Sequence, residues 1–229
     1  MDGPPAGADR QLIMQFMTTE HFTLQTARAV VNAEISARLQ LYMTTLSSSI
    51  IALALVAQVS GVLGRAFEAF ALVLLPVVYF LGVVTLARLL QASAEWRTYG
   101  QGMNRIRHWY LEAAPEMQPY FVLPATDDPW ASLAAIGVGS RRAWQGMLTT
   151  APWILVVVNS VLAGVVAGLL ARLAGASGPL VPALAGAAGF VVSLVVLGAY
   201  EQRKFSHEME TAPVAFALTD EPTGPDRPV

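Results

Sequence analysis

The chain has 229 residues, of which 55% are hydrophobic and only 13% are charged, and its net charge is −2. Soluble domains contain about 25% charged residues, so this composition is typical of a membrane protein. The sequence has no cysteine, which excludes disulfides, thiolate nucleophiles, iron–sulfur clusters and covalently attached c-type haem. The charge balance gives no indication of nucleic-acid binding, and we expect none.

Four stretches of the chain contain no charged residue: 41–64, 69–87, 148–171 and 179–200. Each is close to the roughly 20 residues that a helix needs to cross the hydrocarbon core of a bilayer. The sequence therefore predicts an all-α integral membrane protein with four transmembrane helices.

The distribution of basic residues predicts the orientation. Of the 14 Lys and Arg residues, three precede the first span, six lie between the second and third, three follow the fourth, and the two remaining turns hold one each, Arg65 and Arg172. Basic residues near span ends stay on the cytoplasmic side. We therefore expect both termini and the long central segment to be cytoplasmic. Residues 1–38 contain no apolar stretch followed by a cleavage site, so no cleavable signal peptide is expected.

The first predicted element covers residues 18–64. Residues 1–17 begin with a run rich in Pro and Gly, and we expect them to be disordered. A helix can start near Thr18 and continue without Pro or Gly as far as Gly61, and only about half of it is needed to cross the hydrocarbon. The rest is predicted to extend into the cytoplasm with an apolar stripe of Leu24, Ala27, Val31 and Ile35.

The second element, residues 65–114, also extends beyond its charge-free window. Pro76 lies inside the window, where it is expected to kink the helix and act as a hinge. Apolar residues then recur at intervals of three and four, as in a coiled-coil seam. Since the first two helices run antiparallel, we expect the stripe of residues 24–35 to pack on this seam. The members of the seam are Trp96, Tyr99, Met103, Ile106, Tyr110 and Ala113.

The second half of the chain is expected to contain a loop, an amphipathic helix and a hairpin. Residues 115–147 form a proline-rich cytoplasmic loop followed by a helix at 131–147. Residues 148–200 form the hairpin of spans 3 and 4, and 201–229 are a cytoplasmic tail. Small residues on one face of each span allow the two backbones to approach closely. These residues are Ser160, Gly164 and Gly168 on span 3, and Ala185, Gly189 and Ser193 on span 4.

The predicted spans contain neutral polar side chains. No ionisable side chain lies near the middle of any span, which disfavours proton-coupled transporters, pumps and voltage sensors. In an oligomer, a stripe of neutral polar groups could line a pore. Alternatively, the hydroxyls bond back to their own helix and the amides hold helices together. The pore-lining candidates are Thr44, Thr45, Ser48, Gln58 and Asn159.

Basic side chains after span 2 form a second candidate site. Guanidinium groups near a membrane surface suit phospholipid head groups or a small anionic ligand. Positive-inside topology alone also requires arginines here, and nearby carboxylates are close enough in sequence to pair with them. The candidates are Arg105, Arg107, His108, Arg141 and Arg142.

No enzyme signature is present in the sequence. There is no nucleophile elbow and no HExxH pattern, and the three histidines are far apart. The Asp127–Asp128 pair could bind a divalent cation, but before Pro129 it is more often a helix cap. We therefore expect no catalytic activity, no cofactor and no metal site.

Three stretches carry a resemblance: TEHFTLQTARA at 19–29, RIRHWYLEAAPE at 105–116, and PYF at 119–121 with the Asp pair after it. They resemble an uncharacterised family of small bacterial four-pass integral membrane proteins, and the similarity extends from about residue 18 to 170. In the pattern of that family two tyrosines follow the RIRH segment and a histidine precedes the Asp pair, whereas Trp109 and Thr126 stand here. The resemblance assigns no activity, and it implies that the cytoplasmic segments, rather than the spans, carry the recognisable sequence. We expect the protein to lie in the bacterial inner membrane.

Two functions are compatible with these features. The first is a homo-oligomeric channel-like or membrane-perturbing protein, gated or recruited through its cytoplasmic helical stalk. The alternative is a non-conducting membrane scaffold that recruits a soluble cytoplasmic partner. Neutral polar spans favour the first function, and a stalk longer than an anchor needs is compatible with both.

Overall fold

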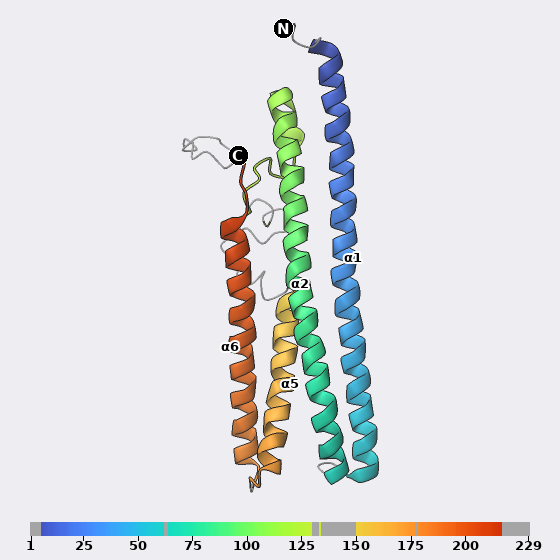
Figure 1. Cartoon of the computed structure of the whole chain (residues 1–229), viewed down its shortest axis with the longest axis vertical. Helices are drawn as coiled ribbons and strands as arrows, with labels where there is room; N and C mark the ends of the chain where they lie inside the picture. The colour runs from blue at the N-terminus through green and yellow to red at the C-terminus, as the bar shows by residue number, and fades with distance from the viewer. Residues whose placement is uncertain (1–5, 62–63, 130–132, 134–149, 177, 217–229) are drawn as a thin grey trace. The chain divides into compact units, whose positions relative to one another are not determined.

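The computed structural model describes residues 6–61, 64–129, 133, 150–176 and 178–216. These residues contain no strand. The described elements are helical, which confirms the predicted all-α class. The four α-helices among them are long and apolar enough to cross a membrane. The elements are α1 (Ala6–Ser60), α2 (Arg65–Ala113), η1 (Pro115–Tyr120, a 3-10 helix), α5 (Ala151–Leu173) and α6 (Leu180–Thr211), shown in Figure 1.

Helix α1 begins at Ala6, well before the expected Thr18. This differs from the expectation that residues 1–17 are disordered. No Pro or Gly follows Gly7 until Gly61, and the residues in between include many good helix formers such as Arg, Gln, Leu and Met. The Pro- and Gly-rich composition of the first few residues therefore does not extend to the sequence that follows them.

Helix α2 is continuous from Arg65 through Pro76 to Ala113. It ends at Ala113, and Pro115 shortly after it has no backbone N–H with which to continue the helix. The predicted continuity of span 2 with the following segment is thus present. Gly102 lies inside the predicted seam because Leu24 packs there: a Cβ at Gly102 would lie 2.9 Å from the Cδ1 atom of Leu24.

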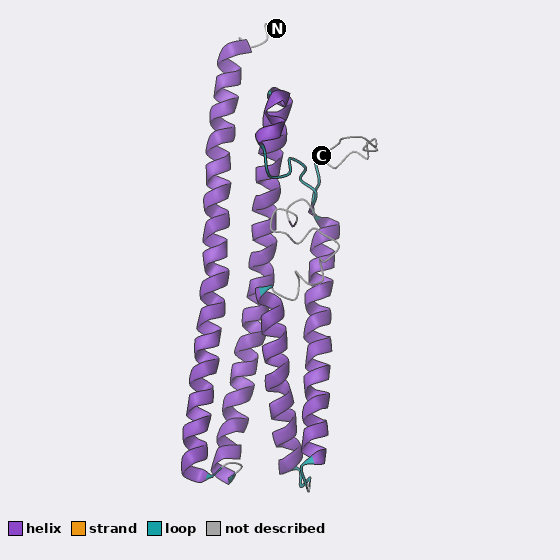
Figure 2. Cartoon of the chain, turned by 180° about the vertical axis from the view of Figure 1, so that it is seen from behind, coloured by secondary structure: helices purple, strands orange, loops and turns teal. Residues whose placement is uncertain are grey.

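The chain divides into two compact units, and each is described by itself. The apolar unit comprises Ala29–Trp96 and Arg142–Glu210, and the polar unit comprises Met1–Arg28, Arg97–Arg141 and Thr211–Val229. Within the apolar unit, the parts of α1, α2, α5 and α6 lie side by side (Figures 1 and 2). Its most deeply buried large apolar residues are Val78, Leu86, Leu89, Leu155 and Val156.

Helices α5 and α6 approach each other through glycines. A Cβ at Gly164 would lie 2.8 Å from the carbonyl oxygen of Gly186, and one at Gly189 would lie 2.7 Å from the Cβ of Ala167. Ser160 and Ser193 meet on the same side, with their hydroxyl oxygens 3.5 Å apart. Helix backbones therefore touch where small residues were expected to permit it.

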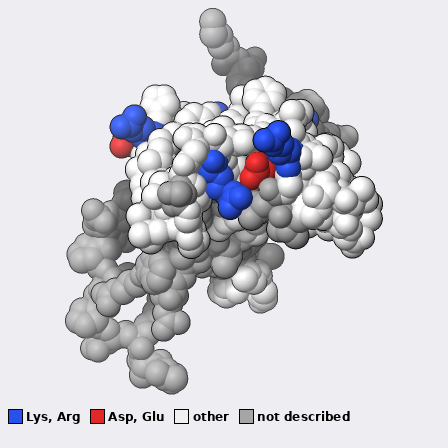
Figure 3. All heavy atoms as spheres, turned by 90° about the horizontal axis from the view of Figure 1, so that it is seen from below, with Lys and Arg blue, Asp and Glu red and all other residues white. Residues whose placement is uncertain are grey.

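The end of the apolar unit that carries the helix turns is almost uncharged. Gly61, Gly175 and Gly178 have φ angles of 77°, 89° and 81°, which a residue with a Cβ rarely adopts. Figure 3 shows this end, where a few charged side chains lie among uncharged atoms. Glu68 of α2 and Arg172 of α5 form an ion pair here, with 3.3 Å between Oε1 and Nε.

Candidate functional sites

In the polar unit, the Asp127 carboxylate is fully buried and holds the segment that follows α6. Its two oxygens accept hydrogen bonds from the backbone N–H groups of Ala215 and Phe216, at 2.9 and 2.8 Å. The N–H of Asp127 donates in return to the carbonyl of Phe216, at 3.3 Å. Asp127 therefore holds the chain at Ala215 and Phe216. The helix cap expected from the sequence concerns the residues after Pro129, most of which lie outside the described residues.

We refer to the hydrogen-bonded contacts of Asp127 with Ala215 and Phe216 as the clasp. Helix α2 supplies its other contacts. Arg105 donates to Asp127 over 2.6 Å and to the carbonyl of Pro213 over 2.6 Å. Gln101 donates to the Asp127 carbonyl, and the His108 ring stacks on Phe216 with 4.0 Å between ring centroids. The clasp thus joins α2, the loop after η1 and the segment after α6.

Burial opposes ionisation of Asp127, but its hydrogen bonds outweigh burial. The N–H groups of Ala215 and Phe216 and the Arg105 guanidinium together lower the pKa of the Asp127 carboxyl below its usual value. The carboxylate is consequently charged at neutral pH, and its oxygens are engaged by protein donors. Because these donors occupy the Asp127 oxygens, the carboxylate is poorly suited to bind the divalent cation considered from the sequence. The neighbouring Asp128 carboxylate accepts a hydrogen bond from the hydroxyl of Thr126.

Arg107 points elsewhere and lies in a cationic environment. Its side chain is only 9% exposed and donates to the amide oxygen of Asn104. Burial lowers the pKa of His21 and of Arg28 on α1, and the positive charge of Arg107 lowers both further. The Nδ1 atom of His21 is buried and has no hydrogen-bond partner. Two α1 side chains, absent from the candidates chosen from the sequence, therefore share the surroundings of Arg107.

The five predicted basic residues do not form one cluster in the described part of the chain. Arg105 is paired with Asp127, and His108 lies 3.4 Å from the Glu112 carboxylate. Arg107 is instead close enough to His21 for its positive charge to lower the pKa of His21. Arg141 and Arg142 lie outside the described residues, as does the expected amphipathic helix at 131–147.

A largely apolar pocket of about 330 Å³ lies in the polar unit. Thr18 of α1 and Tyr110 of the predicted seam meet near it, with 3.4 Å between their hydroxyl oxygens. Arg10 is the one charged residue of the lining, which otherwise consists of Met14, Trp109, Tyr110, Ala113, Ala114, Met117 and Phe121.

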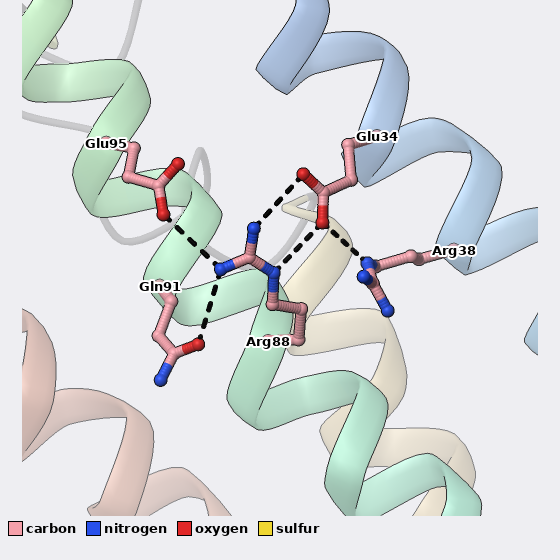
Figure 4. Close-up of polar contacts among 5 residues, drawn as sticks. All are labelled: Glu34, Arg38, Arg88, Gln91 and Glu95. Atoms are coloured by element: carbon pink, nitrogen blue, oxygen red, sulfur yellow. Dashed lines mark hydrogen bonds and ion pairs between the residues drawn. The ribbon is translucent and has the colours of Figure 1, made fainter.

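In the apolar unit, Arg88 of α2 lies at the centre of an ion-pair network (Figure 4). Its Nε and Nη2 atoms contact Oε1 and Oε2 of Glu34 at 2.9 and 3.2 Å, and its Nη1 contacts Glu95 at 3.3 Å. Glu34 also accepts from Arg38, the i,i+4 partner predicted from the sequence, at 2.7 Å. Hydrogen bonds from Arg88 and then Arg38 lower the pKa of Glu34 below its usual value.

The five pore-lining candidates fall into two groups. Asn159 is completely buried in the helix bundle, where its Oδ1 accepts from the Tyr42 hydroxyl at 2.8 Å and its side chain fills the space beside Gly82. Thr44 and Thr45 are exposed on α1 and donate to the carbonyls of Gln40 and Leu41, as the alternative interpretation expected. Ser48 and Gln58 are exposed on the same helix.

One face of α1 is uncovered within the apolar unit. In α1 the most apolar 18-residue window is 11% buried, against 28%, 33% and 17% in α2, α5 and α6. The exposed residues at the centre of this face recur at intervals of four and three, the spacing of a coiled-coil seam. We refer to them as the α1 outer seam: Ala37, Leu41, Thr44, Ser48, Ile51, Leu55 and Gln58.

The chain matches no family model, no curated protein and no solved structure.

Proposed function

We propose that the chain is a homo-oligomeric, channel-like or membrane-perturbing protein of the bacterial inner membrane, in which neighbouring subunits meet along the α1 outer seam. The observation that supports this proposal is the outward position of Thr44, Ser48 and Gln58. These polar side chains face away from the bundle of their own subunit. In a lone subunit they would face lipid, where the Gln58 amide finds no hydrogen-bond partner.

Parallel association of identical chains satisfies these groups. Copies inserted in the same orientation place Gln58 opposite Gln58 at the same depth, and an amide both donates to and accepts from another amide. A seam repeat of four and three residues lets two such faces interlock. Closed cyclic symmetry then generates a ring of α1 helices. Thr44 and Ser48 supply the polar lining of that ring.

The distribution of basic residues places the polar unit in the cytoplasm in this proposal. Ligand or partner binding there biases the packing of α1 and α2, and Pro76 gives α2 a point at which its direction can change. The lipid bilayer is the first partner of the protein, and a small anion or a cytoplasmic protein is the second.

Cysteine cross-linking tests the interface, because the chain has no cysteine of its own. Ser48→Cys in native membranes should give a covalent dimer on mild oxidation. Val165→Cys is a matched control, since Val165 is 46% exposed but lies in the groove between α5 and α6. Cross-linking of Val165→Cys with none of Ser48→Cys would contradict the proposed interface.

Ion flux from liposomes tests conduction separately. The double variant Thr44→Val, Ser48→Val should keep the oligomer but change the flux, because it removes both hydroxyls from the proposed lining. A cross-linked oligomer that releases no ion or dye with or without membrane tension would exclude the channel and leave the interface standing.

A non-conducting scaffold is the second candidate. It is favoured by the hydroxyls of Thr44 and Thr45, which are already satisfied by carbonyls of their own helix. Under this proposal the polar unit recruits a soluble partner, and the variant Thr44→Val, Ser48→Val is fully functional. Unchanged flux in this variant would favour the scaffold.

A further inference from the structure

The polar unit contains one arginine with a built-in counter-charge and one without. Arg105 and Arg107 are two residues apart on α2, so they point to different sides of the helix. Arg105 reaches the buried carboxylate of Asp127. Arg107, although only 9% exposed, donates to the neutral amide oxygen of Asn104. A neutral amide satisfies hydrogen bonds but does not balance the charge of a guanidinium.

Leu24 packs against Gly102, which brings the turn of α1 that carries His21 to the segment of α2 that carries Arg107. His21 adds a second unsatisfied group there. Its Nδ1 is buried without a hydrogen-bond partner, and its environment includes the positive charge of Arg107. No carboxylate of the described residues offsets burial at His21 or at Arg107. Arg28, about two helical turns after His21 on α1, adds to the positive potential. A buried guanidinium in a folded protein is normally paired with an anion, so the burial of Arg107 against a neutral amide favours an external anion.

We propose that His21 and Arg107 form a binding site for a phosphate group, with Arg28 contributing positive charge. A guanidinium offers two parallel N–H donors to a phosphate, and a protonated imidazole offers a third donor. A phosphate monoester carries close to two negative charges at neutral pH and would balance the cations around it.

A soluble phosphate compound fits the position better than a lipid. His21 precedes the charge-free window that begins at residue 41 by 20 residues, or about 30 Å of continuous helix. The head-group layer on each side of the hydrocarbon is only about 5–8 Å thick. A phospholipid phosphate therefore does not reach His21, whereas a small phosphorylated metabolite does.

Phosphate-dependent thermal stability of the full chain in nanodiscs of neutral lipid tests the site. Inorganic phosphate should raise the melting temperature of the wild-type protein above that in chloride at equal ionic strength. His21→Gln and Arg107→Gln should each weaken the apparent affinity by about tenfold or more, since each removes a charge-assisted hydrogen bond. Arg10→Gln is the matched control, because Arg10 is an exposed arginine of the same unit and should leave the affinity unchanged.

Two further measurements make the outcome decisive. Without phosphate, Arg107→Gln should be at least as stable as the wild type, since it removes an unbalanced buried charge. In the wild type, NMR of the His21 ring should show that phosphate raises its pKa, a readout that requires no variant. Equal phosphate responses in Arg10→Gln and Arg107→Gln would overturn the site. A response seen only with phosphatidic acid in the nanodisc would overturn the soluble source.

This site does not depend on the channel proposal. Binding is measured on the protein in whatever oligomeric state it adopts, so loss of the seam interface leaves the phosphate test unaffected.

Discussion

Arg88 holds both carboxylate oxygens of Glu34, with its Nε 2.9 Å from Oε1 and its Nη2 3.2 Å from Oε2. This fork joins α2 to α1 beside their charge-free windows. Only a guanidinium presents two parallel donors at this spacing, so a lysine cannot reproduce the geometry. The pair therefore fixes the relative register of the two helices as well as contributing attraction.

The Arg88–Glu34 pair makes stability depend on pH in a definite direction. Its hydrogen bonds lower the pKa of Glu34 in the folded state below the ordinary value of 4.5. This contribution is present above the unfolded pKa and is lost as the pH falls through the folded one. We expect the melting temperature in detergent to fall on acidification, and Glu34→Gln to reduce that dependence. Arg88→Lys should lower the melting temperature modestly at neutral pH, and no change would contradict the role of the fork.

Asp127→Asn should release the segment that follows α6. The substitution keeps the shape of the side chain but removes the charge that Arg105 and two N–H groups recognise, and we expect a loss of roughly 1–3 kcal/mol in stability. Hydrogen exchange at Ala215 and Phe216 should accelerate. Thr126→Val, which removes a neighbouring hydroxyl, is the control, and equal exchange in both variants would contradict the clasp.

The clasp also predicts behaviour in acid. Because the pKa of Asp127 is lowered in the folded state, its stabilisation holds above the unfolded value of 3.8 and is lost as the pH falls through the lower folded pKa. Exchange at Ala215 should therefore stay slow through mildly acidic conditions. Release of this segment well above the ordinary aspartate pKa would show that another group controls it.

Gly82→Ala should disrupt the buried polar pair in the apolar unit. A methyl group at Gly82 would overlap the Asn159 amide, which accepts the Tyr42 hydroxyl, and we expect a loss of about 1–3 kcal/mol. Gly198→Ala is the control, since its Cβ would lie 3.4 Å from the Trp153 ring, an ordinary contact. Thermal unfolding of both variants in one detergent makes the comparison direct.

His21 should make the polar unit sensitive to pH near neutrality. Burial, and then the charge of Arg107 on α2, lower its folded pKa below 6.5, and Arg28 is the neighbouring cation on its own helix. An unfolded chain then binds the proton more tightly than the folded one, so stability falls as the pH drops through 6.5. His21→Gln should flatten this dependence in phosphate-free buffer, and an unaltered pH profile would argue against it.

The helices could be predicted from the sequence because hydrophobicity and Pro and Gly positions are local signals. The four apolar helices and the continuity of α2 follow from them. The start of α1 was missed because the composition of its first residues obscured a good helical sequence after Gly7.

The sites were harder to predict because their members come from distant parts of the chain. Arg105 and Arg107 are close in sequence, yet one meets Asp127 and the other lies with His21, and only the fold separates them. The antiparallel register implied by Leu24 and Gly102 could have indicated that His21 lies near Arg107. Nothing local indicated that Asp127 would bind Ala215 and Phe216.

The separation of these partners constrains the order in which the protein assembles. The N–H groups that donate to the Asp127 carboxylate belong to residues 88 and 89 positions later in the chain. Until the ribosome has released Ala215 and Phe216, the Asp127 carboxylate can pair with Arg105 but not with these two N–H groups. A chain that stops before Ala215 therefore leaves the Asp127 carboxylate without these two donors, and it would differ from a chain that contains them in a feature that cellular proteases could detect.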